Sequence, residues 1–288
     1  MAVIAEVGAT LRSYRCGDRD VVDSFNPSEI CPGAHGALLF PWPNRIKNGR
    51  YSYKGQSFQL DLSEPSTSSA IHGLLRWRPF DVIAREGNYV SLRTELHPTP
   101  GYPFDLSLES NYQLSRDGLE VFSTVTNLGS AIAPFGLGHH PYISFGPGAT
   151  VDDGQVSMEA NSYLSSDPTT GWIGEKAGCA QTDLDFSKGK HMRGVSLDHT
   201  FMDLARDQNG KGWIYVSGQD ERVVALWMDE HYSYIQLFTS DTLEGERRRK
   251  AIAVEPMTCG PQAFRSGESL LELGPSEQAS LSWGMKLL

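Results

Sequence analysis

Short segments in which apolar and polar residues alternate recur along this chain, and Gly, Asn or Asp separates many of them. Such alternation is typical of strands that bury one face. Pairs of these segments around turn-forming residues predict hairpins at residues 50–60, 81–96, 106–127 and 222–241. No segment shows a sustained 3.6-residue pattern with helix caps. The pattern therefore predicts an all-β fold.

The composition fits a turn-rich chain, with 29 glycines and 16 prolines among 288 residues. The sequence contains no internal repeat, low-complexity tract or linker, and we interpret the glycine-rich stretch 144–155 as a long loop inside one domain spanning residues 1–288. No apolar run approaches the roughly 18 residues of a membrane helix. The first residues lack the basic and apolar regions of a signal peptide. We therefore expect a cytoplasmic protein with no membrane partner.

The formal net charge of −10 disfavours a nucleic-acid partner, because phosphate binding needs clustered Lys and Arg. The basic run "ERRRK" at 246–250 is interpreted as a solvated loop, with a phosphate or partner site as the alternative. The cysteines form no C-x-x-C pair and no zinc-like spacing with histidine, so we expect free thiols.

Several polar residues in the strand-rich sequence have ionisable or hydrogen-bonding side chains that a β-sheet core does not require. They are Arg45, His72, His139, His140, Asp198, Gln236 and Glu255. Glu255 is unusual, because the apolar run "AIAVEPM" would carry its carboxylate into a largely apolar setting, which is costly unless the group is paired or its pKa is raised. A metal site is the competing interpretation of these ligand types, but the long separations and the absence of an H-x-H or H-E-x-x-H pair disfavour it.

The adjacent histidines of "GLGHHPYISF" pose a separate question. Neighbouring residues of an extended chain point to opposite sides, so His139 and His140 cannot easily serve one purpose.

The ordered set of motifs resembles the aldose 1-epimerase (galactose mutarotase) family from about Gly36 to the C-terminus. The most specific stretches are "HPY" at 140–142 and "VEPMTCGPQAF" at 254–264, and "HGLLRWRPF" at 72–80 is similar to the bacterial mutarotase-like branch. The resemblance implies a large antiparallel β-sandwich, a supersandwich, that holds a sugar in an open cleft on one sheet.

The resemblance also implies roles for individual residues. His140 matches the general acid, Glu255 the general base, and His72 the second active-site histidine, which helps at the ring oxygen. Arg45 and Asp198 match the residues that hold sugar hydroxyls, and Gln236 is a looser match that rests on "QLFT". His139 has no counterpart and is expected to point to the other side or lie beside the site. The mechanism needs no cofactor and no metal.

The expected function is the interconversion of α and β anomers of a free hexose such as galactose or glucose, by a monomer or homodimer. Trp42, Trp77 and Tyr142 are candidates to stack on the sugar, with core packing as the alternative for each. Gln262 and Arg265 replace the family's usual aspartate and asparagine, which bears on the identity of the sugar.

Two other function classes stay open. One is a hexose-phosphate 1-epimerase in which the basic run, or Arg76 and Arg78, reaches the phosphate. The other is a non-catalytic sugar-binding or regulatory module, which is disfavoured because the acid and the base are both retained.

Overall fold

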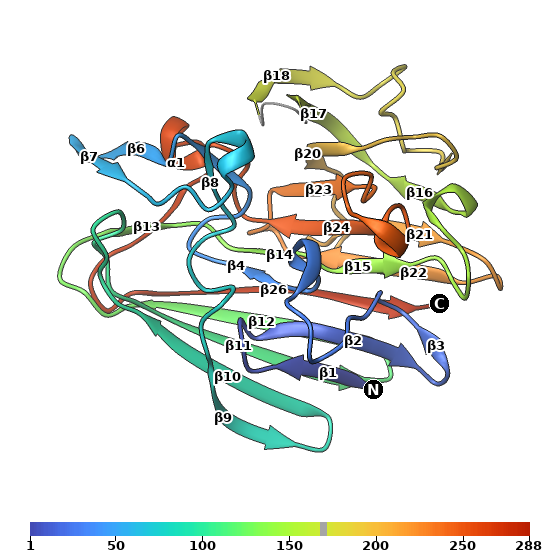
Figure 1. The fold of residues 1–288 in the computed structure, drawn as a ribbon, viewed down its shortest axis with the longest axis horizontal. Helices are drawn as coiled ribbons and strands as arrows, with labels where there is room; N and C mark the ends of the chain where they lie inside the picture. The colour runs from blue at the N-terminus through green and yellow to red at the C-terminus, as the bar shows by residue number, and fades with distance from the viewer. Residues whose placement is uncertain (168–171) are drawn as a thin grey trace.

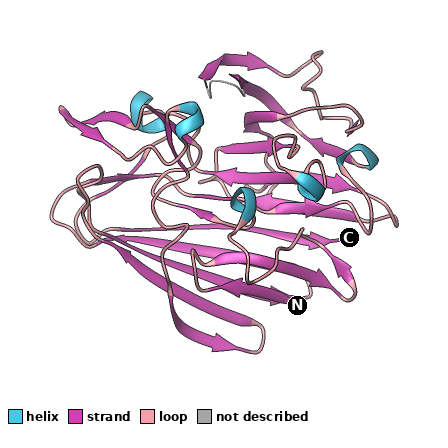
Figure 2. Ribbon diagram, viewed as in Figure 1, coloured by secondary structure: helices cyan, strands magenta, loops and turns pink. Residues whose placement is uncertain are grey.

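The computed structural model describes residues 1–167 and 172–288, and strands dominate this part of the chain (Figure 2). Within these residues, sheet 1 contains nine antiparallel strands and sheet 2 contains eight. In order, sheet 1 runs β19 (Lys190–His191), β16 (Gln155–Met158), β21 (Gly212–Ser217), β22 (Val223–Met228), β26 (Gln278–Leu287), β12 (Gly118–Asn127), β11 (Leu106–Ser115), β10 (Tyr89–Leu96) and β9 (Asp81–Glu86). Sheet 2 runs β18 (Trp172–Gly178), β17 (Ala160–Asp167), β20 (Asp198–Leu204), β23 (Tyr234–Phe238), β24 (Ala251–Met257), β14 (Gly138–His139) and β4 (Leu38–Leu39), and β15 (Tyr142–Ser144) also pairs with β24.

The two sheets lie against each other and share a hydrophobic core (Figure 1). Val121 of β12 and Trp283 of β26 belong to the same buried cluster as Ile252 and Val254 of β24. This arrangement confirms the predicted all-β fold, a large antiparallel β-sandwich.

In the described part of the chain, smaller strands and one short α-helix surround the two sheets, together with four 3-10 helices at Pro32–Ala34, Pro65–Thr67, Val151–Asp153 and Gly245–Arg247. The smaller strands form a sheet of β1 (Ala2–Ala5), β2 (Thr10–Cys16) and β3 (Arg19–Asp20) and the pairs β5 (Arg45–Lys47) with β8 (Ser69–Ile71), β6 (Arg50–Tyr53) with β7 (Gln56–Gln59) and β13 (Ala133–Phe135) with β25 (Leu271–Leu273), and the short α-helix is α1 (Ala263–Ser266). β6, β7, β8 and α1 lie together at the upper left of Figure 1. This group carries part of the site described below.

The predicted hairpins at 50–60, 81–96 and 106–127 are confirmed as β6–β7, β9–β10 and β11–β12. The hairpin predicted at 222–241 is wrong, because β22 lies in sheet 1 and β23 lies in sheet 2. The connection crosses between the sheets, and Asp229 holds it there by accepting a hydrogen bond from the Ser282 hydroxyl of β26 at 2.8 Å. Both strands are buried along most of their length, so local alternation could not indicate that they separate.

The four cysteines are free thiols, of which Cys179 and Cys259 are buried. Among the described residues, no helix is both long and apolar enough to cross a membrane.

Candidate active site

The site is built on the face of sheet 2 that points away from sheet 1. Along β24, Ile252 and Val254 enter the shared core, so the period-two alternation of a strand places Glu255 on the opposite face. Gln236 of β23 pairs in register with Glu255, and Thr200 of β20 pairs with Gln236. Three neighbouring strands therefore present a row of polar side chains.

The adjacent histidines separate to the two sides of sheet 2. His139, the last residue of β14, is buried with its ring centroid 5.1 Å from that of Trp283 in sheet 1. His140 points the other way, and its Nε2 lies 3.2 Å from Oε1 of Glu255. His139 is therefore a core residue, and His140 lies at the site.

His140 and Glu255 form a buried pair with little access to water, since their residues are 4% and 2% exposed. Burial raises the pKa of Glu255 well above its ordinary value, and Asp198 raises it further, while Arg45 opposes the shift. Burial also lowers the pKa of His140, and the nearby His35 adds to this effect. The two shifts together favour a neutral pair that shares one proton between the carboxyl group and the imidazole.

His72 completes the group of titratable side chains. Its ring lies edge-on to that of His140 with centroids 5.4 Å apart. His72 has a φ of +59°, in the left-handed region that few residues other than glycine adopt. Gly73 must follow it, because a Cβ at Gly73 would lie 2.0 Å from the carbonyl oxygen of Phe40. The glycine after His72 thus has a direct structural cause.

His72, His140 and Glu255 also satisfy the distance test for a metal site, since one ligand atom from each lies within 4.8 Å of the others. The tautomer of His72 argues against a metal. The backbone N–H of Asn44 donates to Nδ1 of His72 at 3.1 Å, so the neutral ring carries its proton on Nε2. A metal-binding histidine normally donates its second N–H to an acceptor. Here that nitrogen is an acceptor, and the three residues fit proton transfer better than metal binding.

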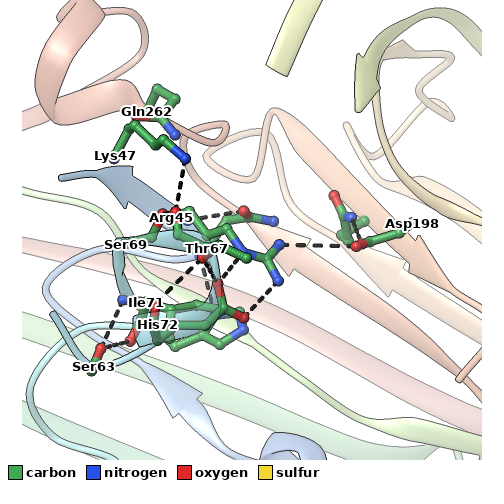
Figure 3. Close-up of polar contacts among 12 residues, drawn as sticks. Arg45, Lys47, Ser63, Thr67, Ser69, Ile71, His72, Asp198 and Gln262 are labelled. Atoms are coloured by element: carbon green, nitrogen blue, oxygen red, sulfur yellow. Dashed lines mark hydrogen bonds and ion pairs between the residues drawn. The ribbon is translucent and has the colours of Figure 1, made fainter. Parts of the chain in front are cut away.

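Two acidic residues, Glu64 and Asp198, hold Arg45 at the site (Figure 3). Its Nε donates to Oε2 of Glu64 at 2.6 Å, and a second nitrogen donates to Oε1 of Glu64 at 2.8 Å. A third nitrogen lies 3.9 Å from Oδ2 of Asp198. Burial alone would lower the pKa of Arg45, but the hydrogen bonds and charge of Glu64 raise it on balance. The guanidinium is therefore fixed in place and charged.

Gln236 acts on Asp198 and does not border the cavity. Its Nε2 donates to Oδ1 of Asp198 at 2.6 Å, and its own Oε1 accepts a hydrogen bond from the Thr200 hydroxyl. Gln236 thus positions a carboxylate that faces the cavity.

These groups surround a cavity of about 380 Å³. Its lining includes Arg45, Glu64, His72, Arg76, Trp77, His140, Tyr142, Asp198 and Glu255. Of the three aromatic candidates, Trp42 is buried against Phe264 and does not reach the cavity. Trp77 is 54% exposed at the cavity and is free to contact a ligand.

Tyr142 borders the cavity, but its ring lies between two histidine rings. His35 stacks on it at 3.7 Å between centroids, and His140 stacks on it at 5.0 Å. The Nε2 of His35 lies 3.1 Å from Oδ2 of Asp23, a buried carboxylate whose other oxygen lies 2.7 Å from Nζ of Lys250. The sequence analysis missed this support of His140, because nothing in the spacing of Asp23, His35 and Tyr142 relates them.

Three of the four basic residues in the run 246–250 form ion pairs within the protein, and the fourth, Arg248, is exposed. Arg247 pairs with Asp23 and Glu29, Arg249 pairs with Asp152 and Asp241, and Lys250 pairs with Asp23. These ion pairs account for Arg247, Arg249 and Lys250 without a phosphate ligand.

Gln262 and Arg265 also lie outside the cavity lining. Oε1 of Gln262 accepts the backbone N–H of Lys47 at 2.8 Å, and the Gln262 N–H donates to the carbonyl of Arg45 at 2.9 Å. Gln262 therefore holds β5 and sets the position of Arg45 (Figure 3). Arg265 lies in α1 and borders a different surface depression with Arg50 and Gln59.

Comparison with known proteins identifies relatives over nearly the whole chain. The family model described as aldose 1-epimerase matches residues 1–285. The uncharacterized protein YihR of Escherichia coli (strain K12) is 35% identical over 278 residues, which are 94% of this chain and 85% of that protein. The galactose mutarotase of Homo sapiens is 27% identical over 241 residues, 78% of this chain and 68% of that protein. Among solved structures, a GalM/aldose epimerase homologue from C. elegans has a TM-score of 0.87 and 19% sequence identity to this chain. The alignment covers 100% of this chain and 95% of that chain, and at this identity the similarity shows the fold alone.

Proposed function

Because this chain belongs to the aldose 1-epimerase family, we propose that it interconverts the α and β anomers of a hexopyranose by opening and reclosing the sugar ring. The observation that carries this proposal is the buried contact of 3.2 Å between His140 and Glu255 beside a cavity of about 380 Å³. An acid and a base in direct contact, next to fixed hydroxyl-binding groups, form the arrangement that anomerisation requires.

In the proposed reaction, Glu255 removes the proton from the C1 hydroxyl and His140 donates a proton to the ring oxygen. The C1–O5 bond breaks, an open-chain aldehyde forms, and rotation about C1–C2 exposes the other face of the carbonyl. His140 then takes back the proton from O5 as it attacks C1, and Glu255 returns its proton to the carbonyl oxygen. The protein ends each cycle in its starting protonation state.

The pair must hold one proton at the start, located on His140 when the sugar is bound. The neutral form of the empty site carries the same proton on Glu255, so binding shifts the proton without any exchange with solvent. Arg45 favours the ionised form of Glu255, because its charge lowers the pKa of that carboxyl. In this proposal His72 donates from Nε2 to the ring oxygen, and the hydrogen bond that its Nδ1 accepts from Asn44 supports this by leaving the proton on Nε2.

Arg45 and Asp198 hold sugar hydroxyls in this proposal, and Gln236 keeps Asp198 in place. We place the reaction in the cytoplasm, in one domain that spans the chain, with no cofactor. The proposed sugar is unphosphorylated, because Arg247 and Arg249 of the basic run pair with carboxylates of the protein and no residue of the run lines the cavity.

The proposal is tested by following anomer interconversion of freshly dissolved α-D-galactose and α-D-glucose by NMR or polarimetry. We expect a rate above the spontaneous rate that is proportional to enzyme concentration. The dependence of kcat/KM on pH should be bell-shaped, because activity requires the one-proton state of the pair. Binding of sugars without faster anomerisation would favour the non-catalytic module instead.

A further inference from the structure

The cavity is lined by a second arginine, Arg76, that has no carboxylate in direct contact among the described residues. Arg76 lines the cavity and is half-buried. Among the described residues its guanidinium makes no hydrogen bond and no ion pair. The guanidinium carbon lies 5.6 Å from the centre of the Trp77 ring, and the charge of Glu64 acts on Arg76 from beyond ion-pair distance. By contrast, Arg45 in the same cavity is bound through two nitrogens to one carboxylate.

The acidic residues of the cavity are already engaged. Both oxygens of Glu64 accept hydrogen bonds from Arg45, and one also accepts from the Thr67 hydroxyl. Asp198 is bound by Gln236 and faces Arg45. Cys31 also lines the cavity, but burial raises the pKa of its thiol to about 11, so it provides no negative charge at neutral pH. Glu64 offsets part of the charge of Arg76 without pairing with it directly, so Arg76 keeps a positive charge in a partly desolvated place with no carboxylate in direct contact.

Such a charge is costly to the unliganded protein. Burial lowers the pKa of Arg76, which reflects the lost hydration of its guanidinium. A planar guanidinium recovers this cost best with a planar carboxylate, through two parallel hydrogen bonds. One arginine matches one such group, whereas the dianionic phosphate monoester is bound better by several cations.

The position of Arg76 indicates where the negative group lies on the sugar. Arg76 lines the same cavity as His72 and His140, and its positive charge helps to lower the pKa of both histidines. In the proposed reaction these histidines face the ring oxygen. In a hexopyranose the ring oxygen is bonded to C1 and C5, and C5 carries the exocyclic C6. A negative group on C6 would thus project towards Arg76.

We propose that Arg76 is a specificity-determining residue that binds a carboxylate on C6, so that the preferred substrate is an acidic hexopyranose of the uronic acid type. This inference rests on the proposed anomerase function of the same site. The acidic group leaves the chemistry at C1 and the ring oxygen unchanged, and it adds a contact that a neutral hexose cannot make.

The test compares D-galacturonate and D-glucuronate with D-galactose and D-glucose, and with the corresponding hexose 6-phosphates, in an NMR anomerisation assay corrected for the spontaneous rate. We expect kcat/KM for one uronate to exceed that for its neutral counterpart by about 10–100-fold, the range of one charge-assisted contact. Arg76→Gln should lower this preference by a similar factor of about 10–100, mostly through KM.

Arg78→Gln is the matched control, because Arg78 is an exposed arginine of the same segment that does not line the cavity. It should leave the preference unchanged, and melting temperatures should show that both variants are folded. Equal kcat/KM for uronates and neutral sugars, a preference that survives Arg76→Gln, or a preference for the 6-phosphates would each overturn the inference while the anomerase function stands. Absence of anomerisation with every sugar would instead overturn the proposed function.

Discussion

Replacement of Glu255 by glutamine removes the proposed general base while it keeps the size and polarity of the side chain. The glutamine side chain would keep the size of the original and a polar contact with His140, whose Nε2 lies 3.2 Å from the present carboxylate. It could not accept the proton of the C1 hydroxyl. Loss of one general base costs about 10²–10⁴-fold, so kcat should fall by that factor, which is about 2.7–5.5 kcal/mol in the barrier. KM should change little, because Arg45 and Asp198 are untouched.

The same variant has a stability signature. Burial raises the pKa of Glu255 above its value in the unfolded chain. The contribution of the protonated Glu255 to the free energy of unfolding is therefore fully present below the unfolded pKa and is lost as pH rises towards the folded pKa. Glutamine has no such dependence. The melting temperature of Glu255→Gln relative to wild type should therefore increase as pH rises from about 4 to 8, starting near the ordinary glutamate pKa.

The assay is NMR anomerisation beside thermal unfolding across this pH range, with Glu246→Gln as a control at an exposed glutamate. Turnover of Glu255→Gln close to wild type would refute the assignment of the base. A melting-temperature difference that does not change with pH would refute the raised pKa.

Further predictions concern the histidines, metals and the basic run. His140→Asn should lower kcat by about 10²–10⁴-fold, whereas His139→Phe should leave turnover near wild type, and equal losses in both would contradict the assignment of the two sides. Burial lowers the pKa of His139 to about 3, so the neutral ring contributes to stability above about pH 6.5 and this contribution is lost as pH falls towards 3. In thermal denaturation at acid pH, His139→Phe should therefore be more stable relative to wild type than it is at neutral pH. Exhaustive chelation should leave the anomerisation rate unchanged, because His72 carries its proton on the nitrogen that a metal would need; a loss restored by a divalent ion would contradict this. Arg249→Ala should lower the free energy of unfolding by about 1–3 kcal/mol with turnover retained, since Arg249 bridges Asp152 and Asp241, while the exposed Arg248→Ala should change neither quantity in denaturant melts.

The sequence indicated the strands and the separation of the two adjacent histidines, because both follow from the period-two geometry of extended chains. It also indicated that Glu255 would be buried, from the apolar run around it. These features depend on neighbours in the chain, and local patterns report such neighbours well.

Contacts between distant segments could not be predicted in the same way. Nothing near Arg45 indicates that Glu64 would bind it, and the engagement of Arg247 and Arg249 depends on Asp23 and Asp152 far away in the sequence. The wrong hairpin at 222–241 has the same origin, because β22 and β23 are adjacent in sequence but pair with strands of different sheets. The role of Gln262 as a support for β5 likewise appears only when the chain is folded.

The central claim is that the buried pair of His140 and Glu255 transfers protons to open and close a sugar ring. The most direct measurement is NMR of anomer exchange in the wild-type protein with a panel of neutral and acidic hexoses, beside the Glu255→Gln variant at equal concentration. We predict exchange well above the spontaneous rate for at least one sugar, and its loss by about 10²–10⁴-fold in the variant. Exchange at the spontaneous rate with every sugar, or equal exchange in the two proteins, would contradict the account.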